Sequence, residues 1–479
     1  MTERILIVGA SGYIGNHLVP HLAARGHEIT ATGRALRVLK KRAWGDAENI
    51  TLKQLDLISD DITPLLEDID IVIFLVHGMA HGHDFIDYEL NATQQLRKAL
   101  DRSQVKQVIY LGALQPQTDA ASEHLVARQK TGEELRKSKV PIVELRAGIV
   151  VGPGSAAFEV MRDFIYHLPL LFTPRWVNST SSPIALDNLL YYITQLVDNP
   201  TTGNPIYDIA GPEVLTYQSQ MMQLGDAMGK KVHLIKLPFL TPEMTAHFFG
   251  IITSVPSNIA KALVSGLRYH LPADDKAIRE RFPQTLITYR DAVTKTLEQE
   301  EDVVRSDVWG FDPDALQRWH KGYGYYPKNA GFSHTTHASA EQLWRIVNQL
   351  GEEPGYFYAN ALWRIREWMD YAIGGSARKR QRTAKNQLAI GDYIDSWKVI
   401  AVEENRFLSL LFGMKAPGLG RLEFTISDEG DKRRLDIRAW WHPAGFPGLL
   451  YWFAMMPAHL FIFKGMVKAV CERAEQSGH

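Results

Sequence analysis

Short apolar runs alternate with longer amphipathic stretches along the first part of the chain. The runs rich in aliphatic and β-branched residues are "RILIVGA" (4–10), "HEITATG" (27–33), "ITLKQLDL" (50–57), "IDIVIFLVH" (69–77), "VKQVIYLGAL" (105–114) and "PIVELRAGIVVG" (141–152). The stretches between them carry apolar residues at helical spacing. Strands that alternate with helices predict right-handed crossovers and a doubly wound parallel sheet of the α/β class.

The texture of the sequence changes after residue 152, where prolines and aromatic residues become frequent. Helical patterns follow at 188–199, 216–229 and 290–304. We expect this region to complete the sheet and to add a small substrate lobe, mainly residues 153–312, over its carboxyl edge. Together with the strand-rich start it makes a first domain of residues 1–312, followed by a linker at 313–330.

A third region, residues 331–479, predicts an α+β domain. Ser339 and Gln342 have the spacing of a helix capping box, and apolar residues follow at helical spacing. Four strand-like runs come next: "DYIDSWKVIAVE", "RFLSLLFGM", "GRLEFTISDEG" and "RRLDIRAWWHP". The chain ends in an apolar helical pattern. Seven of the 11 tryptophans lie in this region, which favours a well-filled core or a large apolar pocket.

Residues 446–463, "FPGLLYWFAMMPAHLFIF", are apolar over almost the length of a membrane span, which needs about 20 residues. Pro447, Pro457 and His459 argue against spanning. We interpret the stretch as a buried C-terminal helix with a loop before it, and keep a peripheral membrane contact as the alternative.

Composition limits the class of protein. A chain of 479 residues is too long for one ordinary domain. A formal net charge of -1 gives no basic field for nucleic acid, so no nucleic-acid partner is expected. The single cysteine, Cys471, fits a reducing compartment, and no signal-peptide pattern precedes Ile5. We therefore expect a cytoplasmic protein.

The loop after the first strand carries the clearest chemistry, because it reads G-x-x-G-x-x-G and opens a helix. Glycine is needed where the chain turns, where a diphosphate approaches and where helix meets strand. Amide hydrogens at the start of that helix then attract phosphate. The predicted cofactor residues of this loop are Gly9, Ser11, Gly12, Tyr13, Ile14 and Gly15.

The second strand indicates which dinucleotide is bound. NAD binders usually place a carboxylate about 20 residues after the loop, for the ribose hydroxyls. Here the strand ends in Gly33 and Arg34, with Arg37 shortly after. A guanidinium there suits the 2′-phosphate of NADP, although NAD stays open. Asp56 and Leu57, after the third strand, are expected to meet the adenine.

These features resemble the extended and atypical short-chain dehydrogenase/reductase superfamily over residues 1 to about 300. The resemblance includes the glycine loop, Asp56-Leu57, "FLVHG" (74–78), "LRAGIVVGPGS" (145–155) and "SPIALDNL" (182–189). With the third region included, the whole chain resembles bacterial NmrA-like, YbjT-type NAD(P)-binding proteins, whose C-terminal domain has no established function. The resemblance implies a Rossmann domain that binds NADP. The third region is similar in pattern to the START/polyketide-cyclase-like helix-grip fold.

The resemblance also indicates where catalysis would lie. Active members carry a Tyr four residues before a Lys, and a Ser at the preceding strand end. Here Lys130 corresponds to the lysine, but Val126 stands at the tyrosine position, and Gly112 and Ala113 stand where the serine is expected. His124 is the substitute proton donor that we consider, and Lys130 is expected to bind the nicotinamide ribose. Val76, His77 and Gly78 are expected to line the nicotinamide.

Two further clusters have simpler explanations. The loop "HGMAHGHD" offers His77, His81, His83 and Asp84, but its spacing does not specify a tetrahedral metal site, so no metal is predicted. The basic stretch 374–386 lacks aromatic residues for base stacking and is expected to be a solvated loop.

Two functions follow from these expectations. The first is an NADP(H)-dependent reductase of a hydrophobic carbonyl or quinone-like compound, which lacks the usual Tyr and Ser. The alternative is a non-catalytic NADP(H)-sensing regulator or scaffold. A small hydrophobic molecule in the C-terminal domain is an expected partner, and a lipid carrier at a membrane surface ranks third.

Overall fold

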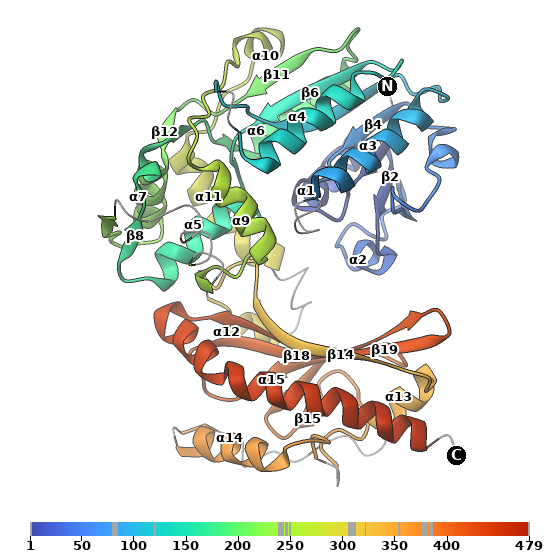
Figure 1. Cartoon of the computed structure of the whole chain (residues 1–479), viewed down its shortest axis with the longest axis vertical. Helices are drawn as coiled ribbons and strands as arrows, with labels where there is room; N and C mark the ends of the chain where they lie inside the picture. Colours follow the sequence, from blue (N-terminus) through green and yellow to red (C-terminus); the bar gives the residue numbers. More distant parts are fainter. Residues whose placement is uncertain are drawn as a thin grey trace. The chain divides into compact units, whose positions relative to one another are not determined.

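The computed structural model covers the whole chain and describes residues 2–78, 85–118, 121–237, 244, 248, 251–304, 313–320, 322–352, 355–372, 374–375, 382 and 387–477. The chain divides into two compact units (Figure 1). The first comprises residues 1–165 and 169–307. The second comprises residues 308–479 together with Tyr166–Leu168.

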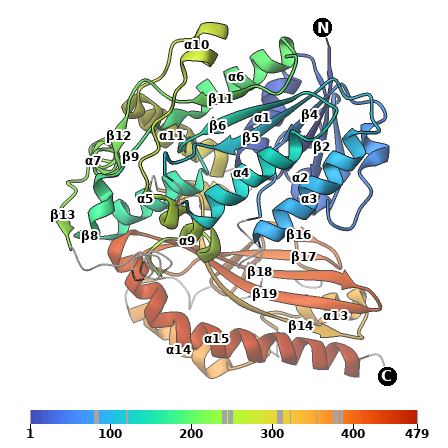
Figure 2. The ribbon, with the colours of Figure 1, turned by 45° about the horizontal axis from the view of Figure 1, so that its top comes forward.

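A seven-stranded sheet forms the centre of the first unit (Figure 2). Its strands are, in spatial order, β3 (Ile50–Gln54), β2 (Glu28–Gly33), β1 (Arg4–Val8), β4 (Ile71–Phe74), β5 (Gln107–Ala113), β6 (Ile142–Ala147) and β11 (Ile206–Ile209). Every pairing in this sheet is parallel. The doubly wound sheet expected from the alternating pattern is confirmed, including each of its six predicted strands.

Helices cover both faces of this sheet, because alternate residues of the central strands point to opposite sides. They are α1 (Tyr13–Ala23), α2 (Leu36–Lys40), α3 (Phe85–Leu100), α4 (Glu123–Leu135), α6 (Leu186–Asp198) and α10 (Lys276–Arg281). Ile5 and Ile7 of β1 belong to the core formed with α1 and α6. Leu6 and Val8 belong to the core formed with α3. Strands buried on both faces explain the continuous apolar runs of the sequence.

The remainder of the first unit is built from short two-stranded sheets and helices. The paired strands are β7 (Val150–Val151) with β10 (Ile184–Ala185), β8 (Leu171–Thr173) with β13 (Leu234–Lys236), and β9 (Thr180–Ser181) with β12 (Leu215–Thr216). The helices are α5 (Ala156–His167), α7 (Tyr217–Ala227), α9 (Ser257–Gly266) and α11 (Tyr289–Val304). Short 3-10 turns lie at Thr63–Leu66 and Arg175–Asn178. The helical patterns at 188–199, 216–229 and 290–304 correspond to α6, α7 and α11.

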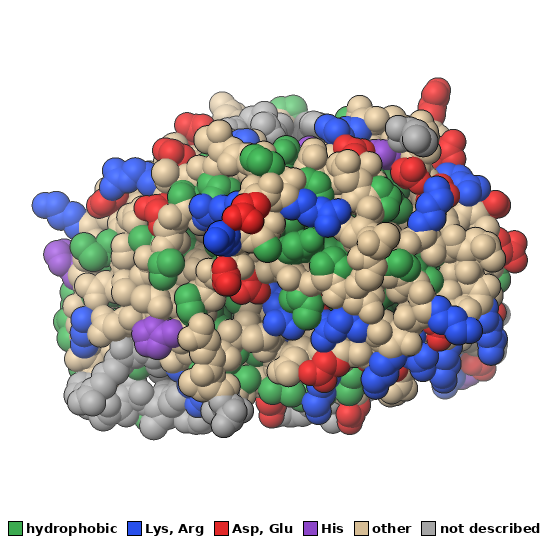
Figure 3. Space-filling model, turned by 90° about the horizontal axis from the view of Figure 1, so that it is seen from above, with side chains coloured by type: hydrophobic (Ala, Val, Ile, Leu, Met, Phe, Trp, Pro, Cys, Tyr) green, Lys and Arg blue, Asp and Glu red, His purple; other side chains and the backbone are tan. Residues whose placement is uncertain are grey.

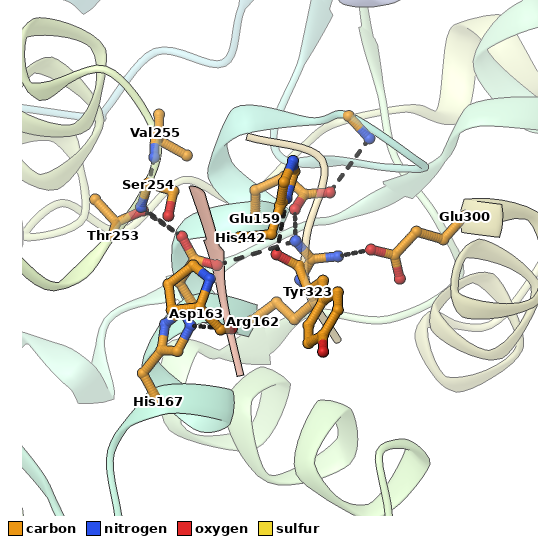
Figure 4. A network of polar contacts seen from close by, with 12 residues as sticks. Glu159, Arg162, Asp163, His167, Thr253, Ser254, Val255, Glu300, Tyr323 and His442 are labelled. Carbon is orange, nitrogen blue, oxygen red and sulfur yellow. Dashed lines mark hydrogen bonds and ion pairs between the residues drawn. The ribbon is translucent and has the colours of Figure 1, made fainter. Parts of the chain in front are cut away.

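A buried ion network holds α5 to α11 (Figure 4). The guanidinium of Arg162 is fully buried and contacts the carboxylates of Glu159 and Glu300. Asp163 lies 3.9 Å from the same guanidinium and accepts hydrogen bonds from Thr253 Oγ1 and the Ser254 amide, at 2.8 and 2.7 Å. Burial lowers the pKa of Arg162, but the neighbouring carboxylates raise it by more than burial lowers it. The side chain therefore stays charged. One cation therefore connects three segments of the first unit.

The second unit contains a six-stranded antiparallel sheet. Its strands are, in spatial order, β14 (Lys328–Thr336), β19 (Lys432–Pro443), β18 (Gly418–Glu429), β17 (Phe407–Phe412), β16 (Trp397–Glu403) and β15 (Tyr393–Ile394). Its helices are α12 (Pro313–Arg318), α13 (Ala340–Val347), α14 (Asn360–Ala372) and α15 (Gly445–Gln476). The segment 313–330, expected as a linker, holds α12 and the first residues of β14. Ser339 and Gln342 form the predicted capping box at the start of α13.

Helix α15 differs from the expected buried helix. It is continuous from Gly445, so no loop lies within residues 446–463. Its second half, from Ile462 to Ala474, packs with α13 and the sheet. Its first half exposes Phe446, Leu450 and Phe453. By length and composition alone, α15 could cross a membrane. Only 28% of its most apolar window is buried, which is less than a core helix would show. The prediction of burial was wrong for part of this half: Leu449 and Trp452 are buried, whereas Phe446, Leu450 and Phe453 are exposed, because the half carries apolar residues on both of its faces.

Charges of both signs occur together on the surface. On the face that Figure 3 presents, Lys and Arg side chains lie among Asp and Glu side chains, with hydrophobic side chains between them. This mixture agrees with the formal net charge of -1.

Candidate functional site

The turn between β1 and α1 requires its glycines. Gly9 has φ of 97°, a left-handed conformation that disfavours a side chain. A Cβ on Gly15 would lie 2.6 Å from the Ala10 Cα and 2.7 Å from the Gly9 carbonyl oxygen. The Gly12 amide donates to that same carbonyl at 3.1 Å. The first strand therefore passes into the helix through a turn too tight for larger residues.

The start of α1 is suited to an anion. Gly12 is its N-cap residue and supplies no side-chain cap, and the first turn contains no acidic residue. A Cβ on Gly12 would meet only the Gly9 carbonyl oxygen within 4 Å, at 3.3 Å, so the space beside it is open. The partial positive charge of a helix start can then act on a phosphate. The side chains of Tyr13 and Ile14 are partly buried and pack against the sheet core.

Cations gather where β2 ends beside the glycine loop. A Cβ on Gly33 would lie 3.2 Å from Ser11 Oγ, which places the two segments in contact. Arg34 and Arg37 are exposed, and Arg34 hydrogen-bonds to the hydroxyl of Tyr88 on α3. Arg42 donates from Nη2 to the Ser11 carbonyl at 3.0 Å.

Arg42 was not identified from the sequence. It follows α2, and only the return of the chain after that helix brings its guanidinium to the glycine loop. No pattern in the sequence indicates that return.

Asp56 and Leu57 lie directly after β3. The Asp56 Oδ1 accepts from the Ile58 amide at 3.0 Å, within the turn that Asp56 itself begins. The side chain of Leu57 is part of the core under α3. A contact of Leu57 with adenine would therefore use its backbone, and the adenine role of both residues stays a prediction.

The loop after β4 is fixed from below by a buried ion pair. Arg128 Nη1 lies 3.2 Å from Glu89 Oε1 and donates to the Val76 carbonyl at 3.1 Å. Glu89 Oε2 accepts from the Gly78 amide at 2.9 Å. Glu89 and Arg128 are only 1% and 8% exposed. A Cβ on Gly78 would lie 2.6 Å from the Phe85 carbonyl oxygen, so this loop too has no room for a larger residue.

His77 lies between Val76 and Gly78 in this loop. Desolvation, and then the charges of Arg128 and Arg34, lower its pKa, so the imidazole is neutral at pH 7 although part of the residue is exposed. A neutral ring beside the carboxyl ends of β1 and β4 fits the predicted lining role. His81, His83 and Asp84 of the same sequence loop lie outside the described residues.

The two predicted catalytic residues have different surroundings. His124 Nδ1 lies 2.9 Å from Ser122 Oγ, and the ring also hydrogen-bonds to the backbone of Ala262. Burial and Arg128 lower the pKa of His124 to about 4. Lys130 is exposed on α4.

Lys130 is two positions after Arg128 on the helix, which turns its side chain about 200° away at about 100° per residue. Arg128, four residues after His124, is therefore the cation of α4 that faces the loop after β4. The catalytic roles of His124 and Lys130 stay predictions.

The strand end opposite α4 offers no hydroxyl at the expected positions. Gly112 and Ala113 end β5, and a Cβ on Gly112 would lie 3.2 Å from the Glu144 carboxylate. The arrangement can thus hold a diphosphate and position a ring next to His77.

The two clusters set aside on sequence grounds are only partly described. Among the residues that the structure describes, no group of three or more His, Cys, Asp or Glu side chains is placed to hold a metal ion. In the basic stretch, Arg382 is described: it donates to the Leu350 carbonyl at 2.7 Å and pairs with Glu352 at 3.3 Å. Arg378, Lys379, Arg380 and Lys385 lie outside the described residues.

Comparison with known families assigns the two units separately. Residues 9–160 match a family model described as NAD(P)H-binding. Residues 331–466 match a family model described as a protein of unknown function (DUF2867). The first unit therefore carries an NAD(P)-binding domain, which confirms the resemblance to short-chain dehydrogenase/reductases at that level.

Several individual proteins are similar to this chain at low identity. UDP-glucose 4-epimerase of Vibrio cholerae is 21% identical over 319 residues, which are 60% of this chain and 93% of that protein. The mitochondrial NADH dehydrogenase [ubiquinone] 1 alpha subcomplex subunit 9 of Dictyostelium discoideum is 24% identical over 237 residues, 48% of this chain and 65% of that protein. The crystal structure of UDP-glucuronic acid 4-epimerase from Bacillus cereus in complex with NAD gives a TM-score of 0.48 at 16% identity, covering 63% of this chain and 99% of that one.

Proposed function

We propose that the first unit binds NADP(H) at the carboxyl edge of its sheet and acts through that binding as an NADP(H)-sensing module. The observation that carries the proposal is the glycine turn, in which Gly9 and Gly15 allow a close approach to the start of α1. The uncapped helix start would hold the diphosphate, and the bound cofactor would supply the capacity for hydride transfer.

The choice of NADP over NAD rests on the cations near Ser11. Arg34 and Arg42 lie at the end of β2 and against the glycine loop, where a 2′-phosphate would extend from the adenine ribose. The nearby Asp56 carboxylate is bonded to the Ile58 amide within its own turn. This arrangement favours a doubly charged phosphate over a pair of ribose hydroxyls.

A sensing role is favoured over turnover by the use of the α4 residues. Arg128 is held by Glu89 and Val76, and His124 is held by Ser122 and Ala262. Arg128 stabilises the loop beside the nicotinamide position, and neither Arg128 nor His124 is available to a substrate without loss of its present bonds. Cofactor binding would therefore change the conformation of the loop around His77. A sensor transmits a conformational change of this kind.

A reductase of a hydrophobic carbonyl or quinone-like compound is the second candidate. His124 and Arg128 have the four-residue spacing of the Tyr and Lys in active short-chain dehydrogenases, and both are on α4. A neutral imidazole can exchange a proton near neutrality once its partner bonds rearrange. This candidate needs His124 to turn toward the substrate, away from Ser122.

The test is direct binding followed by single-turnover kinetics on the full chain. Calorimetry should show NADPH binding that Gly15→Ala abolishes, because the new Cβ displaces Gly9 and Ala10. Gly26→Ala is the control: alanine strains the backbone there, because Gly26 has φ of 88°, but its Cβ meets nothing within 4 Å and the glycine turn is untouched, so NADPH binding should be kept. No NADPH binding by the unaltered chain would refute the proposal.

NADPH oxidation with a panel of quinones and aldehydes then separates the two candidates. Binding without oxidation supports the sensor. Oxidation that His124→Gln removes, with NADPH affinity unchanged, supports the reductase.

A further inference from the structure

The second unit contains an apolar cavity, independent of the dinucleotide site. It lies among α14, α15 and the sheet strands β17 to β19, and its volume is about 160 Å³. Its walls include five tryptophans: Trp363, Trp397, Trp440, Trp441 and Trp452. An apolar cavity of about 150 Å³ in a protein can stay dry and take up a ring the size of benzene. The enclosed space therefore suits the apolar end of a small ligand.

The cavity opens beside α14. Leu362, Ile365 and Met369 line it, and they are also 38%, 54% and 55% exposed. One side of α14 thus forms both the rim of the cavity and part of the surface. A ligand longer than the enclosed space could extend along this rim into solvent.

The guanidinium of Arg366 lies in the cavity wall. Arg366 of α14 lies over the rings of Phe412 and Tyr451, with its guanidinium carbon 4.9 and 5.3 Å from their centres. Its Nε donates to Met414 Sδ at 3.4 Å. Among the described residues, no carboxylate lies within ion-pair distance of Arg366, whereas Arg421 in the same wall pairs with Glu423 at 2.7 Å. A cation among aromatic and thioether groups is stabilised by pairing with an anion. An anion that carries an apolar chain also suits the apolar wall.

Further hydrogen-bonding groups in the wall also lack a partner. The Nε1 atoms of Trp363 and Trp440 and the Nδ1 of His459 are buried and make no hydrogen bond within the described part of the chain. An indole N–H is a donor only, and a buried donor without an acceptor is costly. Burial lowers the pKa of His459 to about 4, which keeps its ring neutral.

We propose that this cavity binds a single-chain anionic amphiphile, a carboxylate on an alkyl or aryl-alkyl chain. The apolar chain lies among the tryptophans, and the carboxylate pairs with Arg366 at the rim beside α14. A cationic amphiphile would be repelled by Arg366, and a neutral alcohol would leave it without an anion. The site requires no cofactor and does not depend on the function proposed for the first unit.

The experiment uses the full chain with dodecanoate, below the concentration at which it forms micelles. Binding is measured by calorimetry and by tryptophan fluorescence, since the cavity wall is rich in indoles. Dodecanoate should bind at least about tenfold more tightly than dodecanol, because a hydrogen bond to a charged group contributes more than one to a neutral group. Equal affinity of the acid and the alcohol would overturn the role of Arg366.

Two variants test the position of the ligand. Arg366→Gln should weaken dodecanoate binding by about tenfold or more and leave dodecanol binding unchanged. Arg364→Gln removes the same charge from an exposed position of the same helix and should have less than about a twofold effect, since exposed charges are screened. Similar losses in both variants would mean a general charge effect and would overturn the proposal.

A third variant fills the cavity. Ala458→Phe places a ring in the wall formed by α15 and should abolish binding, and because the ring fills a cavity the unfolding temperature should be kept or raised. Unchanged binding in this variant would place dodecanoate on the outer surface of α14 and α15 and would refute the cavity. Flotation with neutral lipid vesicles is then measured for the filled variant and the unaltered chain. Equal flotation of the two, together with unchanged dodecanoate binding, would identify membrane adsorption instead.

Discussion

The Glu89 carboxylate and the Arg128 guanidinium form a buried pair, 3.2 Å apart, directly beneath the loop that follows β4. Glu89 lies on α3 and Arg128 on α4, so the pair joins the two helices that cover one face of the sheet. Through the Gly78 amide and the Val76 carbonyl, the same pair fixes both sides of His77. Stability of the first unit and the position of the loop around His77 therefore depend on the same two side chains.

Breaking this pair should destabilise the first unit strongly. Arg128→Met leaves the Glu89 charge buried without its partner, which typically costs about 3–5 kcal/mol. Glu133→Gln, an exposed change on the same helix, should alter stability by less than about 0.5 kcal/mol. Urea unfolding of the full chain measures both. Equal midpoints for the two variants would contradict the importance of the pair.

Reversal of the charge at residue 34 should change the preferred dinucleotide. Arg34→Asp is expected to weaken NADPH binding by about 10- to 100-fold, the loss of a charge-assisted contact, and to leave NADH binding unchanged or improved. Lys98→Asp, an exposed change of the same charge on α3, is the control and should keep the ratio of affinities. An unchanged NADPH to NADH ratio in Arg34→Asp would remove the argument for NADP.

Loss of the Arg162 cation should unfold the lobe more readily than loss of an exposed arginine. Arg162→Met removes the cation that the buried carboxylates of Glu159, Asp163 and Glu300 share, and should cost about 3–5 kcal/mol. Arg290→Met removes an exposed pair with Asp226, 3.7 Å apart, and should cost less than about 1 kcal/mol. Comparable unfolding curves for the two methionine variants would show that the network is not stabilising.

The ion pairs of Asp70, at the amino edge of the sheet, predict that stability depends on pH. Asp70 accepts from the Arg4 amide at 3.0 Å, and lies 3.1 Å from both Arg4 Nε and Lys106 Nζ. The bond to the Arg4 side chain, and the smaller effects of the Arg4 amide and Lys106, hold the pKa of Asp70 well below its usual value. A depressed carboxyl pKa stabilises the fold above the pKa of the unfolded chain, about 4, and this stabilisation is lost as the pH falls below that value.

Asp70→Asn should therefore lower stability at pH 7 and flatten its decline in acid. Because Arg4 and Lys106 are about half exposed, the loss at pH 7 should be only about 1 kcal/mol. Unfolding by urea at pH 7 and at pH 3 gives the two values. The same decline between these pH values in both proteins would contradict the assignment to Asp70. NADPH affinity should not change, since Asp70 lies at the opposite edge from the glycine turn.

The local features of the sequence were predictable, because short-range physical rules determine them. The strand from Arg4 to Val8, the glycine turn after it and the cap formed by Ser339 and Gln342 depend on neighbours only a few positions away. Strand β14 and helix α14 were not predicted. Strand β14 is a weakly apolar run whose partner, β19, is about a hundred residues later in the chain. Helix α14 has apolar residues that are largely exposed, which hides its pattern.

The site residues missed by sequence reasoning share a cause. Glu89 reads as an ordinary charged position on an amphipathic helix, yet it is buried because Arg128, 39 positions later, reaches it. Arg42 reads as one of several basic residues after α2, yet it contacts Ser11. Such pairings depend on how helices pack across a sheet. Spacing along a single chain does not contain that information.

All seven strands of the first sheet run in the same direction, so its two ends meet different demands. Asp70 and its cations brace one end, while Gly12, Arg34 and the backbone around His77 form the other. Substitutions at the end with Gly12 and Arg34 could change which nucleotide is bound. They would not require added stability at the end with Asp70. Parallel strand direction thus leaves ligand choice free to evolve separately from resistance to acid.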